Sequence, residues 1–438
     1  MKKYTLAAIL TACMIAYAPF ASPSVRAEGD DYSQPLSTVQ VKKYLVLQTG
    51  VTLPNVTFRY TLTPGQKIEK TDSTHEVLPG PDGAEFIWGE NRVGTTASVT
   101  FTPEDVRKAE SSAPDGSTIP FATDDSSDEV YAEKTLTIDL SRVSFPSAGI
   151  YRYVLTEQGS GMTGLSSTDT RTRYLDVFVH KSDSPEDNTD ENMDQDRFVP
   201  GSVIVRMNNS APDTEGKAGT SVKSTGFADR FATNSLDFSK DVTGNQASFN
   251  QYFKFTVKLT GNTSAENGGT RVMVNGSFDP QPGESMATAY DADVMAAAND
   301  GKITSDGDEG IKYVTLSQLM EGKDFYIKGG QSVRLTGIPA GMGYEVTEDA
   351  EDYTPSTEVT GDDECTVADD SVTDDSLTRD TSLAFLNTRD GILPSTGIAA
   401  AFALPVAALL TGIAGITLLT VKRIRRIRQR ASEGNNSE

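Results

Sequence analysis

Short segments of alternating apolar and polar residues run through most of the chain and predict β-strands. The alternation is clear over residues 136–140 and 253–259, where one face of each predicted strand is apolar and the other is polar. Clusters of Gly, Pro, Asp and Asn separate these segments, and long helical periodicity occurs only near the two ends. The pattern predicts an all-β protein built from β-sandwiches.

The same layout occurs twice along the chain, which predicts two tandem domains. Each copy has a strand with an inward lysine, a later Tyr-containing segment that ends in Thr-Glu, and a last strand with an acid or amide after Phe. We assign the two domains to residues 28–231 and 236–390. Residues 232–235 leave almost no linker between them, which favours a stiff rod.

Strand parity places a lysine, a glutamate and an acid or amide on the apolar face of each domain. In the first domain these are Lys43, Glu157 and Asp229, and the neighbouring Lys42 is expected to point outward. The second domain repeats the set with Lys240, Glu348 and Asn387.

Six such side chains on apolar faces must be paired, neutralised or consumed, because an isolated buried charge costs several kcal/mol. Apolar surroundings favour a neutral amine beside a protonated acid. We therefore predict two intramolecular isopeptide bonds, Lys43 to Asp229 with loss of water and Lys240 to Asn387 with loss of ammonia. Glu157 and Glu348 would shuttle the protons.

Two alternatives to this chemistry remain open at the level of sequence. The six side chains can form ordinary buried salt bridges, and in the first domain Asn234 competes with Asp229 as the acceptor.

The N-terminus has the order of a secretory signal peptide, which we assign to residues 1–27. Two lysines precede an apolar stretch over residues 6–20, and small residues follow. Cleavage after Ala27 is favoured and Ala21 is the alternative. Residues 10–13 also match a lipobox, but the apolar stretch continues past Cys13, which favours an ordinary signal peptide.

The C-terminus resembles the LPxTG cell-wall sorting signal over residues 393–438. Its motif is Leu393, Pro394, Ser395, Thr396 and Gly397. The apolar residues 398–421 follow, which at about 1.5 Å per residue suffice to cross a hydrocarbon core about 30 Å thick, and a basic tail then resists translocation. The resemblance implies that a sortase cuts between Thr396 and Gly397 and transfers the Thr396 acyl group to an amine.

Composition excludes several classes of function. The formal net charge of −23 argues against nucleic acid or an anionic membrane surface as a partner. Cys13 lies in the signal peptide, so Cys365 has no partner for an intramolecular disulfide. The two histidines, His75 and His180, belong to no catalytic motif.

Metal and cofactor sites are not expected either. The acidic runs at 124–129 and 183–196 lack the residue order of an EF-hand and are expected to be solvated loops. We therefore expect no metal, no cofactor and no enzymatic activity apart from autocatalytic bond formation.

Two motifs carry a resemblance to a known family. They are FPSAGIYRYVLTE at 145–157 and GIPAGMGYEVTE at 337–348, and they resemble segments of the major pilins of the streptococcal T-antigen type. The resemblance implies immunoglobulin-like domains that are each locked by a Lys–Asn or Lys–Asp isopeptide bond with a catalytic Glu. These roles fall on the six residues that parity selects, although Asp229 stands where asparagine is common.

The resemblance also implies a function and a set of partners. A backbone pilin accepts Thr396 of the next subunit on a lysine before the last strand of its first domain, which here is Lys223, with Lys217 as the alternative. Sortase, other pilin subunits and peptidoglycan would be its partners at the cell wall. The alternative is a monomeric wall-anchored adhesin or ancillary pilin that binds a host surface ligand.

Overall fold

The computed structural model describes residues 36–391, except 115–116, 118, 123–127, 168–169, 183–196, 215–222 and 278–311. Contacts divide the chain into a compact unit, Met1–Arg389, and a second unit, Asp390–Glu438. The predicted signal peptide and the predicted sorting signal lie outside the described residues. Within the described part of the chain, no helix is long and apolar enough to cross a membrane.

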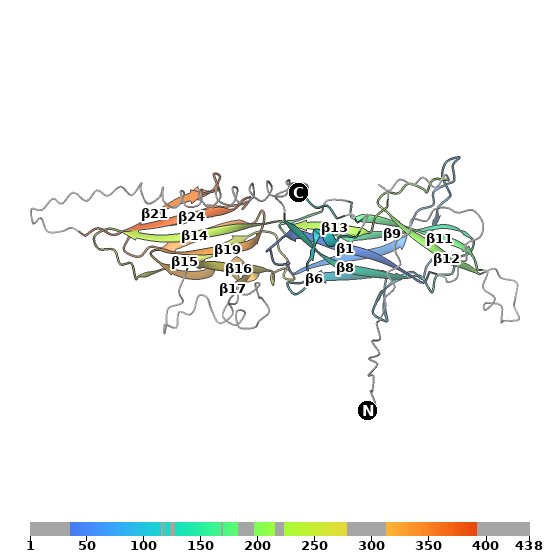
Figure 1. The fold of residues 1–438 in the computed structure, drawn as a ribbon, viewed down its shortest axis with the longest axis horizontal. Coiled ribbons are helices and arrows are strands. Elements are labelled where there is room, and N and C mark those ends of the chain that lie inside the picture. Colours follow the sequence, from blue (N-terminus) through green and yellow to red (C-terminus); the bar gives the residue numbers. More distant parts are fainter. Residues whose placement is uncertain are drawn as a thin grey trace, which may run out of the picture. The chain divides into compact units, whose positions relative to one another are not determined.

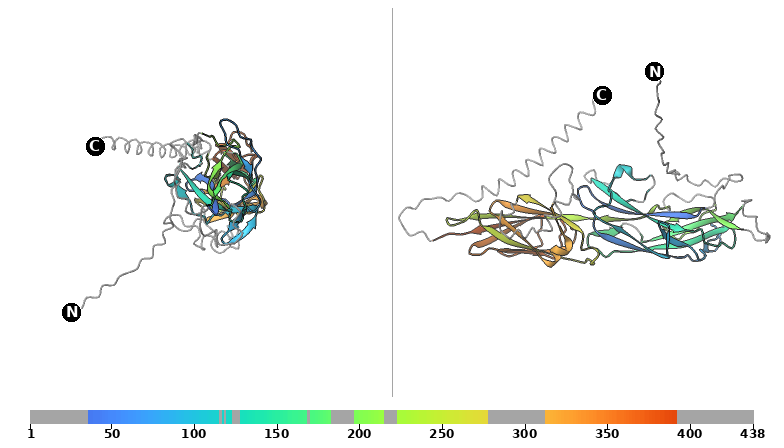
Figure 2. Two further views of the ribbon diagram at one scale, coloured as in Figure 1. Left: turned by 90° about the vertical axis from the view of Figure 1, so that its right-hand side faces the viewer. Right: turned by 90° about the horizontal axis from the view of Figure 1, so that it is seen from below.

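Strands β1–β13 form two facing sheets, here called the first sandwich (Figures 1 and 2). One sheet has the order β10-β13-β1-β8-β4-β5, with β7 on β8, and the other has the order β12-β11-β9-β2-β6, with β3 on β9. The strands are β1 (Thr38–Gln48), β2 (Val56–Pro64), β3 (Leu78–Pro79), β4 (Glu85–Trp88), β5 (Asn91–Gly94), β6 (Thr96–Phe101), β7 (Lys108–Ala109), β8 (Glu129–Asp139), β9 (Gly149–Gln158), β10 (Leu165–Ser167), β11 (Thr172–Lys181), β12 (Phe198–Arg206) and β13 (Gly226–Phe231).

Strands β14–β24 form the second sandwich in the same manner. Its sheets have the orders β17-β16-β19-β14-β24-β21 and β18-β15-β20-β23-β22. The strands are β14 (Thr233–Thr243), β15 (Tyr252–Thr260), β16 (Arg271–Ser277), β17 (Lys312–Thr315), β18 (Lys323–Lys328), β19 (Gln331–Pro339), β20 (Gly343–Asp349), β21 (Thr354–Thr360), β22 (Thr366–Val367), β23 (Ser371–Asp374) and β24 (Thr381–Thr388). The short helix α2 (Leu316–Glu321) begins with a capping box at Thr315.

The two sandwiches share one topological feature that positions their polar interiors. In the first, β1 pairs in parallel with the last strand, β13, and in the second, β14 pairs in parallel with the last strand, β24. The lysine strand and the acid or amide strand are therefore neighbours in one sheet of each sandwich. Only Ala232 separates β13 from β14.

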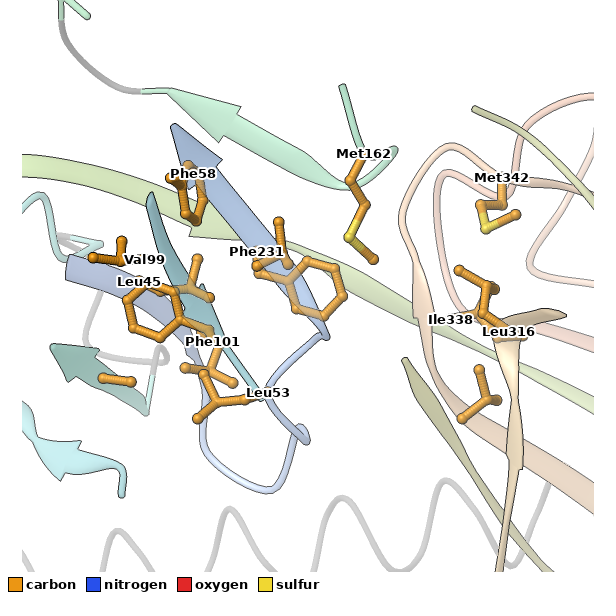
Figure 3. Close-up of a cluster of buried hydrophobic side chains, with 14 of the residues drawn as sticks. Leu45, Leu53, Phe58, Val99, Phe101, Met162, Phe231, Leu316, Ile338 and Met342 are labelled. Atoms are coloured by element: carbon orange, nitrogen blue, oxygen red, sulfur yellow. The ribbon is translucent and has the colours of Figure 1, made fainter. Parts of the chain in front are cut away.

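The predicted alternation is confirmed in the core. The apolar positions of 253–259 are buried while the residues between them are partly or fully exposed, and Leu45, Phe58 and Phe101 lie among the buried side chains drawn in Figure 3. The sequence thus correctly predicts tandem β-sandwiches.

One strand departs from simple alternation. Both faces of β1 are buried near its end, because Tyr44 and Val46 form a second apolar cluster with Tyr131 and Ala228. Three residues from the connection between β7 and β8, Ala113, Ile119 and Phe121, pack against this cluster. The connection between β7 and β8 therefore covers this part of the outer face of β1, while Lys42 remains partly exposed as predicted.

Candidate functional site

The first sandwich brings together the three side chains that parity selects. Lys43 comes from β1 and Asp229 from β13 in one sheet, and Glu157 comes from β9 in the facing sheet. All three are buried, with Lys43 Nζ 2.8 Å from Glu157 Oε2 and in contact with Asp229 Oδ2. The amine is thus held against both carboxylates inside the sandwich.

Three further side chains complete this first site. Lys43 Nζ lies 3.9 Å from the centroid of the Phe58 ring. The Tyr60 hydroxyl donates to Glu157 Oε2 at 2.6 Å, and the Arg171 guanidinium donates to Glu157 Oε1 at 2.7 Å and to Asp229 Oδ1 at 3.4 Å. Burial raises the pKa of Glu157, while the charge of Lys43 lowers it.

The second sandwich builds a smaller site from Lys240 on β14, Glu348 on β20 and Asn387 on β24. Lys240 Nζ lies 2.7 Å from Glu348 Oε1, and Asn387 Nδ2 donates to the same oxygen at 2.9 Å. All three side chains are buried, and Lys240 Nζ lies 4.7 Å from the Phe253 ring centroid. The glutamate again stands between the amine and the acceptor.

Burial dominates the proton chemistry of this second site. It lowers the pKa of Lys240 to about 8 and raises the pKa of Glu348. Among the described residues, Glu348 Oε2 and Asn387 Oδ1 are buried without a hydrogen-bond partner. One oxygen of Glu348 and the amide oxygen of Asn387 thus each keep an unused hydrogen-bonding position inside the buried site.

The structure places Asn234 and Lys42, the neighbours that could compete for roles in the first site, away from that site. Asn234 does not approach Lys43, because its side chain donates to the carbonyl of Leu377 at 2.8 Å. Lys42 is partly exposed and donates to Thr135 Oγ1 at 2.9 Å. Of the two neighbouring lysines, only Lys43 is buried with an acid acceptor.

The predicted intersubunit lysine lies outside these sites. Lys223 is partly exposed and forms an isolated β-bridge with Arg206 ahead of β13. Lys217 and the sorting motif 393–397 lie outside the described residues. No group of three or more His, Cys, Asp or Glu in the described ranges is arranged to hold a metal ion, and most of both acidic runs lies beyond those ranges.

Sequence reasoning missed a second set of buried charges in the first sandwich. Arg152 donates to both oxygens of Asp176 at 2.6 and 2.8 Å, and Arg206 Nε lies 3.7 Å from Asp176. Arg152 also donates to the carbonyls of Asn209 and Ser210, so the cluster fixes the connection after β12. It holds no nucleophile, and we assign it to stability.

Comparison with known proteins finds a pilin that is similar to this chain in sequence. A pilin of Streptococcus pyogenes serotype M1 is 25% identical over 301 residues, which cover 66% of this chain and 72% of that pilin. The chain is therefore similar to a streptococcal pilin. This finding confirms the resemblance predicted from the two sequence motifs.

Family and structure comparisons point to further similarities. Residues 234–389 match a domain of unknown function, DUF7601. The major pilin of Streptococcus pyogenes is similar in structure with a TM-score of 0.45 and 19% identity, covering 81% of this chain and 99% of that one. The T-13 major pilin of the same species has a TM-score of 0.43 and 22% identity, covering 82% and 98%.

Proposed function

We propose that this chain is a backbone subunit of a covalently linked pilus on a bacterial surface. The observation that carries the proposal is the pair of buried Lys–Glu–Asp/Asn sites in a chain similar to a pilin. Cross-links inside each domain would let a thin fibre bear load without unfolding. Residues 28–231 and 236–390 are the two domains of this subunit.

In the second domain, Lys240 Nζ attacks Asn387 Cγ and displaces ammonia. The ammonium group of Lys240 gives one proton to Glu348 and the amine becomes the nucleophile. Protons pass through Glu348 to the amide oxygen and the leaving nitrogen. An ion pair and an amide thus become a new amide, free ammonia and a protonated Glu348, and both atoms and charge balance.

In the first domain, Lys43 Nζ attacks Asp229 Cγ and water leaves. The ammonium of Lys43 and the carboxylate of Asp229 together supply the atoms of the amide and of the water, so their charges cancel. Glu157 takes a proton from the amine and returns it to the leaving oxygen. The product is an uncharged cross-link between the strands β1 and β13.

Intact mass spectrometry tests the two cross-links directly. We expect the mature chain 28–396 to weigh about 35 Da less than its sequence mass, from about 18 Da for water and about 17 Da for ammonia by the condensations above. Peptide mapping assigns each loss to its domain. A chain at its full sequence mass would contradict both bonds.

Assembly into a fibre needs the two ends of the precursor. The signal peptide 1–27 directs export, and a sortase cleaves between Thr396 and Gly397 and joins Thr396 to Lys223 of the next subunit. The last subunit is joined to peptidoglycan. The chain is thus a substrate of sortase and a structural protein, not an enzyme with a substrate of its own.

Immunoblots of wall extracts boiled in detergent test this assembly. We expect a ladder of high-mass species that Lys223→Ala abolishes and that Lys258→Ala, which removes an exposed lysine of β15, leaves intact. A single monomer band in the wild type would contradict the backbone role and favour the wall-anchored adhesin instead. A ladder that survives Lys223→Ala would move the acceptor to another lysine.

A further inference from the structure

Arg171 contacts both carboxylates of the first site but is not one of the two residues that the proposed bond joins. Its guanidinium donates to Glu157 Oε1 at 2.7 Å and to Asp229 Oδ1 at 3.4 Å, and its own carbonyl accepts from the Glu157 N–H at 2.8 Å. A Cβ at Gly159 would lie 3.4 Å from Arg171 Cζ, so the guanidinium packs against the chain. The side chain is 35% exposed whereas that of Glu157 is 1% exposed.

The second sandwich carries the opposite charge at the corresponding place. The N–H of Glu348 donates to the carbonyl of Asp370 at 2.8 Å, as the N–H of Glu157 does to that of Arg171. The charge of Asp370 adds to burial in raising the pKa of Glu348. One glutamate therefore has a fixed cation beside it and the other has a fixed anion.

The two reactions leave different charges behind, an argument that rests on the proposed isopeptide chemistry. Before reaction, Lys43 and Arg171 balance Glu157 and Asp229. Once the charges of Lys43 and Asp229 vanish with the departing water, Glu157 remains buried with Arg171 as its partner. In the second sandwich the described residues place no arginine beside Glu348, and the proton from Lys240 neutralises it.

We propose that Arg171 is a positioning residue that keeps Glu157 ionised before the reaction and returns it to the ionised form afterwards, so that Glu157 works as a base while Glu348 ends as a neutral acid. The charged and titratable groups that face Glu157 are Lys43 from β1, Tyr60 from β2, Asp229 from β13 and Arg171 itself. Of these, only Arg171 is a cation both before and after the bond forms.

Refolding kinetics test the proposal. The chain 28–396 is recovered unfolded from inclusion bodies, before either bond has formed. It is then diluted from denaturant into buffers between pH 5 and pH 8 and quenched at intervals for peptide mapping of each bond. We expect Arg171→Gln to slow formation of the Lys43–Asp229 bond about tenfold at pH 6. The pH below which the rate of this reaction falls should rise by about one unit. Arg171→Lys should restore most of the rate, and the second bond is the internal standard.

A second readout needs no substitution at all. Carbon-detected NMR of the cross-linked wild type at pH 6 should give the side-chain shift of an ionised carboxylate for Glu157 and of a neutral acid for Glu348. A neutral Glu157, or an unchanged rate profile in Arg171→Gln, would overturn the role of Arg171. A wild type that never forms the first bond would instead overturn the proposed function of that site.

Asp370→Asn is the matched control on the other side. It removes a charge at the corresponding place of the second sandwich and should leave the first bond unchanged in rate and pH profile. An equal effect of Asp370→Asn and Arg171→Gln on the first bond would mean a general charge effect and would overturn the proposal.

Discussion

The two sandwiches place a lysine and a glutamate in the same geometry but surround them differently. Both lysines lie over a phenylalanine ring. The first site also contains two acids, an arginine and a tyrosine hydroxyl, whereas the second contains one acid and one amide. In the proposed chemistry, counter-ions balance the charges of the first site, whereas transfer of a proton to Glu348 neutralises the second. The comparison teaches that the acceptor and the surroundings of the glutamate change together, because an acidic acceptor brings a second negative charge that needs a second cation.

Substitution of Lys43 or Lys240 should give the largest losses of stability, and the two losses should differ. Both substitutions delete a cross-link that spans most of a domain, worth about 5 kcal/mol by analogy with a disulfide that closes a loop of such length. Lys43→Met also leaves two carboxylates with one guanidinium, which costs about 3 kcal/mol more. Lys240→Met leaves only a glutamate that can take up a proton.

Urea unfolding measures this difference. Trp88 is the only tryptophan and lies on β4, so its fluorescence reports on the first sandwich, and circular dichroism reports on both. We expect Lys43→Met to lower the urea midpoint of the first sandwich, relative to the wild type, by more than Lys240→Met lowers that of the second sandwich. Equal losses would contradict the idea that the first site depends on its counter-ions.

Arg152→Met tests the dependence on counter-ions away from the reactive site. Asp176 and Arg152 are fully buried, and removal of one partner of a buried ion pair costs about 4 kcal/mol. Asp176 would lose both hydrogen bonds from Arg152 and keep only Arg206, whose Nε lies 3.7 Å away. Arg59→Met is the control, because Arg59 and Glu266 are about half exposed and such pairs contribute less than about 1 kcal/mol. A small effect of Arg152→Met on the Trp88 transition would contradict the assignment.

Much of this arrangement was predictable from sequence and some of it was not. Parity places Lys43, Glu157 and Asp229 correctly because each lies in a regular strand with one dry face. Parity fails for Arg152, which alternates with Tyr151 and Tyr153 and should be exposed. It is buried because Asp176 and the connection after β12 cover it, and such contacts between distant segments leave no periodic signal.

The same limit explains why the residues around Lys43, Glu157 and Asp229 were not predicted from the sequence. Arg171 precedes β11, where no strand pattern fixes its direction, and only its pairing opposite Glu157 brings the guanidinium inward. Tyr60 does follow the alternation of residues 56–62, so a search for polar atoms on dry faces would have found it. A tyrosine packs well in a core, however, and its hydroxyl gives no signal of its own.

The pH dependence of the uncross-linked second site should give an effect of intermediate size. Asn387→Ala leaves Lys240 as a free amine, and burial lowers its pKa from 10.5 to about 8. Between these values the unfolded chain binds more protons than the folded chain, so the free energy of unfolding should rise with pH, by about 3 kcal/mol in total. Below pH 8 both states hold the proton and this contribution is flat.

Urea titrations between pH 7 and pH 10 measure this rise. The double variant Lys240→Met/Asn387→Ala is the control, since it lacks the amine and should show no rise from this group. Identical profiles for the two variants would show that Lys240 keeps an ordinary proton affinity in the fold. The second site would then lack the neutral amine that its reaction needs.

Tyr60→Phe should give the smallest effect and makes the first site more like the second. Tyr60 faces Glu157 across β2 and β9 as Phe255 faces Glu348 across β15 and β20. The substitution removes a hydrogen bond to a charged group, which costs about 1.5 kcal/mol. Arg171 and Lys43 still donate to Glu157, so the Lys43–Asp229 bond should still form. It should form more slowly, and the pH below which its rate falls should be higher.

Trp88 fluorescence in urea and the refolding assay measure the two consequences together. Tyr174→Phe, at a half-buried position of β11 in the first sandwich, is the control and should change the stability by less than about 0.5 kcal/mol. Loss of stability without any change in the rate profile would mean that Tyr60 only supports the fold. A change in both the stability and the rate profile would mean that the Tyr60 hydroxyl, like Arg171, is a donor that favours the ionised form of Glu157. The second sandwich has no such hydroxyl at the corresponding position, because Phe255 stands there.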